Sequence, residues 1–206
     1  MTYLEFREQW HAVGCFNIYQ IRAWKPDFDR NNLFRWVKKG HLSKLRQDWY
    51  AFRDLRSNAE ASRYLACRIY TPSYISLHTA LAFYALIPEA VTAVTCITSN
   101  RPTSYHNDFG EFSYQSVKPS MFFGYKQMPL SPHGSYLLAF PEKAILDLLY
   151  LYPQYNTPEA LLDLRFDGWW MQKELDKERL LEYSEQSGVK SLQSRVKLLL
   201  NTYLND

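Results

Sequence analysis

The sequence predicts an α+β fold. Three observations lead to this prediction: short segments of helical periodicity fill the first forty residues, alternating aromatic and β-branched residues fill the middle, and helical periodicity returns after Pro141. Aromatic residues make up 17% of the 206 residues, which suits β-structure because aromatic rings pack well on a pleated surface. The apolar content of 47% is enough to bury a sizeable core.

Two short helices are expected at the N-terminus. Residues 3–13 carry apolar side chains at roughly helical spacing, and Gly14 follows as a stop. Asn17 is a suitable N-cap for a second helix. That helix ends before Pro26, because the residue before a proline is disfavoured in the helical region.

A third helix and a β-hairpin are expected next. Asp29 can cap a helix over residues 30–39, and Gly40 provides its C-terminal exit. The alternation of apolar and polar residues over 41–52 then predicts a hairpin. Three short helices followed by a hairpin is the element order of a winged helix-turn-helix domain, which we place at residues 1–56.

The rest of the chain, residues 57–206, is expected to form a mixed α/β domain. Strand-like sequence surrounds a turn at Asp108–Gly110, and a helix begins with Pro141 at its first position. Another helix starts at Thr157-Pro158. The remaining chain is expected to form two helices that separate near Gly188.

Positive charge is concentrated in the first quarter of the chain. Residues 1–56 contain eleven Lys and Arg against six Asp and Glu, whereas residues 57–206 contain thirteen against fifteen. Residues 30–46 contain no acidic residue at all. A local basic surface of this kind attracts polyanions such as nucleic acid.

The third helix carries the residue types that bind DNA. Leu33, Trp36 and Val37 fall on one face and can pack inward. Arg and Asn can bond guanine and adenine edges, and Lys neutralises phosphate. We expect double-stranded DNA to be bound in its groove by Arg30, Asn31, Asn32 and Arg35, and at its phosphates by Lys38, Lys39, Lys44 and Arg46.

A solvated cationic face is the simpler explanation for an isolated helix of this composition. Here a short helix precedes it at helix-turn-helix spacing, a hairpin follows it directly, and few acids offset its charge. These three features favour DNA binding. A winged helix that serves only protein contacts remains an alternative.

Little in the sequence indicates catalysis. The three cysteines are odd in number, contain no CxxC pair and are expected to be small buried residues rather than disulfide or zinc ligands. No phosphate-binding glycine motif occurs, and a turn explains His106–Asp108 more simply than a metal site. We therefore expect no enzyme activity and no cofactor. The alternative is a metal-dependent nucleic-acid-processing enzyme that uses Glu142, Lys143 and Asp147.

The N-terminus lacks the apolar stretch of a signal peptide, and no apolar run has the roughly 18 residues that cross a membrane. We therefore expect a cytoplasmic protein that has no membrane partner.

Four segments resemble the AbiEi antitoxin family: "FDRNNLFRWVKKGHLSKLRQDWYAF", "RIYTPSYISLHTALAFYALIPE", "FGEFSYQSVKPSMFFGY" and "FPEKAILDLLYL". The combination is more specific than the helix and hairpin alone, and the two-domain organisation of the family would cover nearly the whole chain. The resemblance implies a winged helix-turn-helix domain fused to an antitoxin domain. It further implies an abortive-infection regulator of a type IV toxin–antitoxin pair.

Proteins of this family resemble repressors that bind inverted repeats in their own promoter and oppose a nucleotidyltransferase-like toxin. The resemblance thus implies operator DNA as a partner, self-association on inverted repeats, and a cognate toxin. Whether the toxin is contacted directly differs among such proteins.

Overall fold

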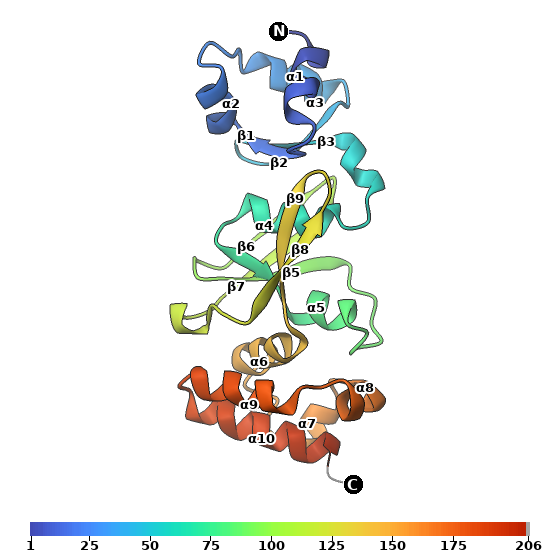
Figure 1. The fold of residues 1–206 in the computed structure, drawn as a ribbon, viewed down its shortest axis with the longest axis vertical. Coiled ribbons are helices and arrows are strands. Elements are labelled where there is room, and N and C mark those ends of the chain that lie inside the picture. The colour runs from blue at the N-terminus through green and yellow to red at the C-terminus, as the bar shows by residue number, and fades with distance from the viewer. Residues whose placement is uncertain (205–206) are drawn as a thin grey trace.

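The computed structural model describes residues 1–204 and shows a mixed α+β protein, as the sequence predicts. Figure 1 shows three tiers along the long axis: N-terminal helices above a small sheet, a larger sheet in the middle, and a group of helices at the C-terminal end. Buried apolar side chains from all three tiers form one core cluster.

The first tier combines three helices with a three-stranded antiparallel sheet in the order β1-β3-β2. Thr2 and Asn17 each form a complete capping box at the start of a helix. The elements are α1 (Tyr3–Trp10), β1 (Cys15–Asn17), α2 (Ile18–Trp24), α3 (Asn31–Lys38), β2 (Leu42–Arg46) and β3 (Trp49–Phe52).

The predicted helices and hairpin of this tier are present, but strand β1 was not predicted. It has three residues, and its pairing partner β3 lies more than thirty residues later. Such a short segment has too little alternation to reveal a strand, so pairing across the tier decides its conformation.

The middle tier is a six-stranded mixed sheet in the order β6-β7-β5-β4-β9-β8. Pairs β5–β7 and β4–β9 are parallel, and the other three neighbouring pairs are antiparallel. The strands are β4 (Ser73–Ile75), β5 (Ala93–Thr98), β6 (Thr103–Asn107), β7 (Gly110–Ser116), β8 (Tyr125–Leu130) and β9 (Gly134–Ala139).

Two helices and two 3₁₀ segments accompany this sheet. Segment η1 (Arg53–Ser57) leads into α4 (Ala61–Ile69), so the chain between the first tier and the sheet is largely helical. Helix α5 (Leu77–Phe83) packs against β5. Segment η2 (Pro119–Met121) lies between β7 and β8.

The third tier is built around α6 (Pro141–Leu151), which packs against α5, α9 and α10. The remaining helices are α7 (Pro158–Leu162), α8 (Gly168–Lys173), α9 (Lys177–Gln186) and α10 (Lys190–Leu204). Thr157 caps α7 as predicted.

The prediction of two helices in the remaining chain was wrong, because α8 is a separate short helix. Asp167 and Asp176 each accept a hydrogen bond from a backbone N–H three residues later, so each starts a new helix. The separation of α9 from α10 near Gly188 is confirmed.

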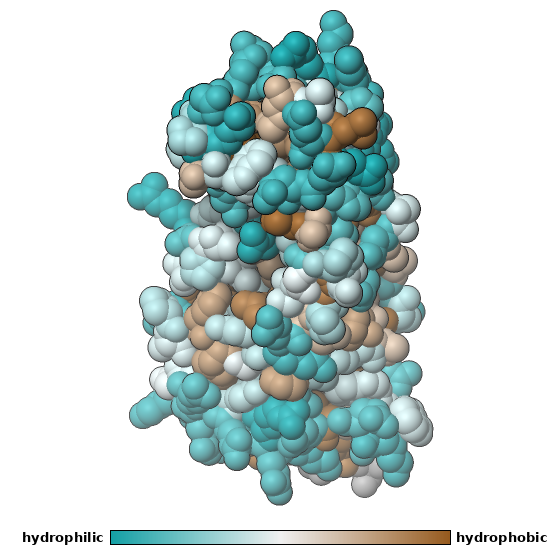
Figure 2. Space-filling view, turned by 45° about the horizontal axis from the view of Figure 1, so that its top comes forward, coloured by the Kyte–Doolittle hydropathy of each residue, from teal (hydrophilic) through white to brown (hydrophobic). Residues whose placement is uncertain are grey.

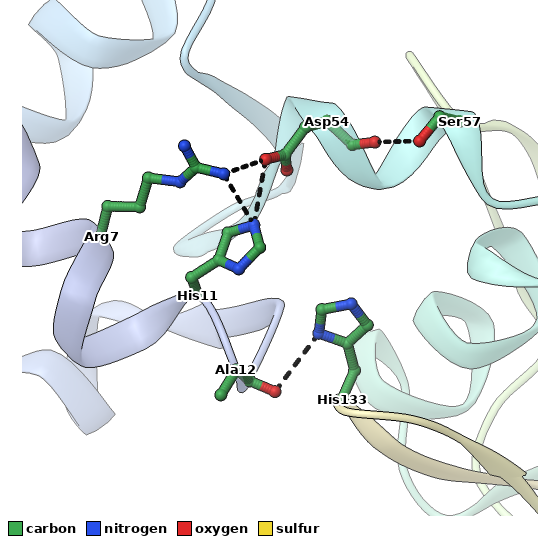
Figure 3. A network of polar contacts seen from close by, with 6 residues as sticks. All are labelled: Arg7, His11, Ala12, Asp54, Ser57 and His133. Carbon is green, nitrogen blue, oxygen red and sulfur yellow. Dashed lines mark hydrogen bonds and ion pairs between the residues drawn. The ribbon is translucent and has the colours of Figure 1, made fainter.

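Polar contacts join the first tier to the second beside η1 (Figure 3). Arg7 Nη2 donates to Asp54 Oδ2 at 2.6 Å, and His11 Nε2 lies 3.0 Å from the same oxygen. His133, in the turn between β8 and β9, has Nδ1 3.3 Å from the Ala12 carbonyl oxygen. Groups far apart in the sequence therefore meet where α1 ends.

Across residues 1–204, none of the helices combines the length and apolarity needed to span a membrane.

Candidate nucleic-acid interface

Helix α3 is oriented by its buried aromatic and aliphatic face. Leu33 and Trp36 are buried, and the Trp36 ring lies 4.8 Å from Phe6 and 5.7 Å from Tyr3 between ring centroids. Asp29 was predicted to cap this helix, but Arg30 occupies the N-cap position without a side-chain cap bond; Asp29 Oδ1 instead accepts from the Asn31 N–H at 2.9 Å in the turn before the helix. The opposite face of α3 consequently points to solvent.

Most of the predicted DNA-binding residues lie on this solvent face or beside it. Arg30 precedes the helix, Lys39 follows it, and Lys44 lies on the neighbouring strand β2. The exposed residues of the predicted set are Arg30, Asn31, Arg35, Lys38, Lys39 and Lys44. In space-filling view, the end of the molecule formed by this tier is mostly hydrophilic (Figure 2).

Three lysines of the face lack an acidic partner. The side chains of Lys38, Lys39 and Lys44 make no hydrogen bond or ion pair with any residue in the described range 1–204. Their ammonium groups are therefore available to a polyanion, and neutralising them by phosphate would release condensed counterions.

Arg30 joins the helix to the hairpin. Its Nη2 donates to Asp48 Oδ1 at 2.5 Å, and Asp48 lies in the turn between β2 and β3 with a positive φ of 62°. The guanidinium also lies 5.8 Å from the Phe34 ring centroid. Arg30 thus fixes the position of the hairpin turn relative to α3 while half of its side chain remains in solvent.

Asn32 does not lie on the exposed face. It is 9% exposed, and its Oδ1 accepts from Arg35 Nη2 at 2.5 Å. The spacing of three residues places the two side chains on neighbouring helical positions. Asn32 therefore positions the Arg35 guanidinium rather than presenting its own amide to a ligand.

Arg46 lies at a junction with the middle tier. Its guanidinium is 5.5 Å from the Tyr105 ring centroid and 5.8 Å from that of Trp49, and its buried Nε has no hydrogen-bond partner within residues 1–204. Stacking on these rings compensates part of the lost hydration. Sequence reasoning could not place Arg46 here, because Tyr105 comes from a strand about sixty residues later.

The same junction holds the hairpin by two hydrogen bonds. Ser43 Oγ donates to Asp108 Oδ2 at 2.7 Å, and Asn107 Nδ2 donates to the Leu45 carbonyl oxygen at 3.1 Å. Asp108 lies in the β6–β7 turn, which the sequence predicted, and Asn107 is the last residue of β6 beside it. That turn supports the hairpin. Within the described part of the chain, no three or more His, Cys, Asp or Glu side chains come together in a group that could hold a metal ion.

The acidic residues of the enzyme alternative are buried in the third tier. Lys143 and Asp147 are both 0% exposed and form an ion pair across one turn of α6. Asp147 also accepts from the Tyr74 hydroxyl at 2.9 Å and from Ser76 Oγ at 2.8 Å. These bonds connect α6 to β4 and the start of α5.

Burial perturbs both members of this pair. It lowers the pKa of Lys143 and raises the pKa of Asp147, although each partner's charge acts in the opposite direction. Glu142 is also buried, and it accepts from the Asp176 N–H and from Arg179. The three residues thus have partners within the protein and are almost fully buried.

Tyr74 and Ser76 were missed as members of this cluster. The available signal was a Lys and an Asp spaced by four on a helix that is otherwise apolar, because such a pair must be buried with partners.

No protein-family model matches the chain, and no curated protein matches it.

Proposed function

We propose that this protein is a DNA-binding antitoxin and transcriptional autorepressor. Residues 1–56 act as a winged helix-turn-helix domain, in which α3 enters the major groove of operator DNA and the β2–β3 hairpin is the wing. Residues 57–206 act as the antitoxin domain, which opposes a nucleotidyltransferase-like toxin.

The observation that carries the DNA-binding proposal is the cationic face of α3 and β2. Lys38, Lys39 and Lys44 are exposed and without acidic partners inside the described chain. Asn31 and Arg35 lie on the same face and supply donors that suit adenine and guanine edges. Phosphate contacts of this kind give most of the affinity, and the base contacts give specificity.

Two residues receive supporting roles in this proposal. Asn32 orients Arg35 through its hydrogen bond, and Arg46 secures the hairpin against Tyr105. The phosphate contact of the wing is then made by Lys44, while Arg30 contacts DNA and holds the hairpin turn.

Support for the antitoxin role comes from the four segments that resemble the AbiEi family. Autorepression by such a protein requires binding to the DNA upstream of its own reading frame, with two copies on inverted repeats. No cofactor is needed for this function.

DNA binding is tested with the duplex upstream of the protein's own reading frame over a series of salt concentrations. Replacing Lys38 and Lys39 together by Ala should weaken binding at each salt concentration. It should also reduce the slope of log affinity against log salt by about two, because roughly one counterion is released per phosphate contact.

The matched control is Lys173→Ala with Lys177→Ala, which removes the same charge at the opposite end of the molecule from exposed positions. The control should keep the wild-type slope. Equal slopes for the two double variants would contradict the assignment of the α3 face, and absence of any wild-type shift would favour the protein-contact alternative.

The antitoxin role is tested separately by expressing the neighbouring reading frame with and without this protein. We expect growth arrest that co-expression relieves. Relief without DNA binding would leave the antitoxin role and remove the repressor role. Incubation of the protein with labelled DNA or RNA and Mg²⁺ tests the enzyme alternative, which predicts products that disappear in Glu142→Ala.

A further inference from the structure

A large apolar side chain is exposed in the middle of the cationic face of α3. Phe34 is 51% exposed, although its neighbours Leu33 and Trp36 are buried. Asn31, Arg35 and Lys38 surround it on the same helix and are exposed. The sequence did not single out this phenylalanine among the candidate DNA-binding residues.

Folding gains little from the half of Phe34 that remains in water, because apolar area stabilises the fold when it is removed from solvent. The aromatic ring is nevertheless held in place. The Arg30 guanidinium lies 5.8 Å from its centroid, and Arg30 is anchored at 2.5 Å to Asp48 in the hairpin turn. One side of the ring is therefore supported, and the remainder faces the same solvent region as Asn31 and Arg35.

Thymine is the base that an apolar group can recognise at such a position. In the major groove, thymine presents a C5-methyl group beside its O4 acceptor, and Phe is among the side chains that contact this methyl group. Asn31 and Arg35 can at the same time bond the edges of adjacent bases.

We propose that Phe34 contacts a thymine methyl group in the major groove and makes this protein select a thymine at one position of each half-site. This inference rests on the proposed DNA-binding function. It adds a residue that determines specificity through apolar contact rather than through charge.

The test compares thymine with deoxyuridine, which lacks only the methyl group. Duplexes that the wild-type protein selects from a random pool are resynthesised with each thymine replaced in turn by deoxyuridine. One replacement per half-site should weaken wild-type binding about four-fold, which is the effect of losing one buried methyl-sized group.

Three variants make the test specific. Phe34→Ala and Phe34→Gln should bind equally to the thymine and deoxyuridine duplexes, whereas Phe34→Leu should keep part of the discrimination. Leu4→Ala is the matched control, because Leu4 is an exposed apolar residue, at 70%, on α1. Leu4→Ala should discriminate like the wild type. Thermal unfolding of each variant identifies any that do not fold. If only one of Phe34→Ala and Phe34→Gln folds, that variant alone serves the test.

The outcomes separate this inference from the function on which it rests. Wild-type binding that no deoxyuridine replacement weakens overturns the role of Phe34 and leaves DNA binding intact. Undiminished discrimination in Phe34→Ala or Phe34→Gln does the same, and it would assign the exposed ring to a protein contact. A wild-type protein that selects no sequence from the pool overturns both proposals.

Discussion

Each of the three cysteines of this protein is buried separately, and none is paired in a disulfide. Cys15, Cys67 and Cys96 are free, as the sequence predicts from their odd number and wide spacing. Burial raises the pKa of Cys15 and of Cys67 to about 12, and it raises the pKa of Cys96 well above its ordinary value. The reactive thiolate form is therefore scarce in the folded protein at neutral pH.

We expect all three thiols to react slowly with an alkylating reagent at pH 8 in the folded protein and rapidly after unfolding in guanidinium. The measurement is the rate of thiol modification with and without denaturant. A thiol that reacts in the folded protein at the rate of a free cysteine would contradict the burial described here.

We expect His78 on α5 to make the stability of the protein depend on pH. Burial, the larger cause, lowers its pKa below the ordinary 6.5, while the charge of Glu89 acts in the opposite direction. Between the lowered pKa and 6.5, the unfolded chain binds a proton that the folded protein resists. Stability therefore falls as pH decreases through this window.

The free energy of unfolding of the wild type, measured in urea, should accordingly fall more between pH 7.5 and pH 5.5 than that of His78→Gln. His106→Gln provides the control, because the His106 side chain is 77% exposed. Equal pH dependence in the wild type and His78→Gln would show that another group is responsible.

Among the elements, helix α6 contains a charge pair, Lys143 with Asp147, in which both side chains are buried. Asp147 accepts from Lys143, Tyr74 and Ser76, so three donors converge on one carboxylate. Breaking such a pair by removing one charge costs about 3–5 kcal/mol, because the other charge stays buried without compensation.

Asp147→Asn changes the charge with almost no change in volume, and we expect it to lower the free energy of unfolding by about 3–5 kcal/mol. Adding Lys143→Met removes the orphaned charge, so the double variant should be more stable than Asp147→Asn alone. Urea unfolding of the two single variants and the double variant gives the coupling energy. Additive losses would show that the pair is not coupled.

At the scale of the whole molecule, the β6–β7 turn couples the middle tier to the hairpin. Ser43 is 1% exposed, and its hydroxyl donates to Asp108. Asp108→Ala would leave that hydroxyl without its acceptor, and a buried unsatisfied polar group costs about 1–3 kcal/mol.

We expect Asp108→Ala to destabilise the protein by about 1–3 kcal/mol and to increase cleavage of the hairpin in limited proteolysis. Asp163→Ala removes an exposed carboxylate on another tier and should leave both measurements unchanged. Unaltered stability in Asp108→Ala would mean that the Asn107 and Arg46 contacts hold the hairpin without this bond.

The sequence by itself determined most of the helices of this protein and the orientation of α3. Local signals suffice there, because a cap such as Asn17 and a buried stripe such as Leu33 and Trp36 act within a few residues. The same reasoning predicted the β2–β3 hairpin and the start of α6 at Pro141.

Only the tertiary structure decided the strand order, strand β1 and the surroundings of Asn32 and Arg46. Parallel pairing of β5 with β7, and the contact of Arg46 with Tyr105, join segments that no local pattern relates. Asn32 and Asn31 are the same residue type at adjacent helical positions, yet one is buried and the other exposed. The rest of the chain determines which face of each element is covered, so long-range packing buries Asn32 and leaves Asn31 exposed.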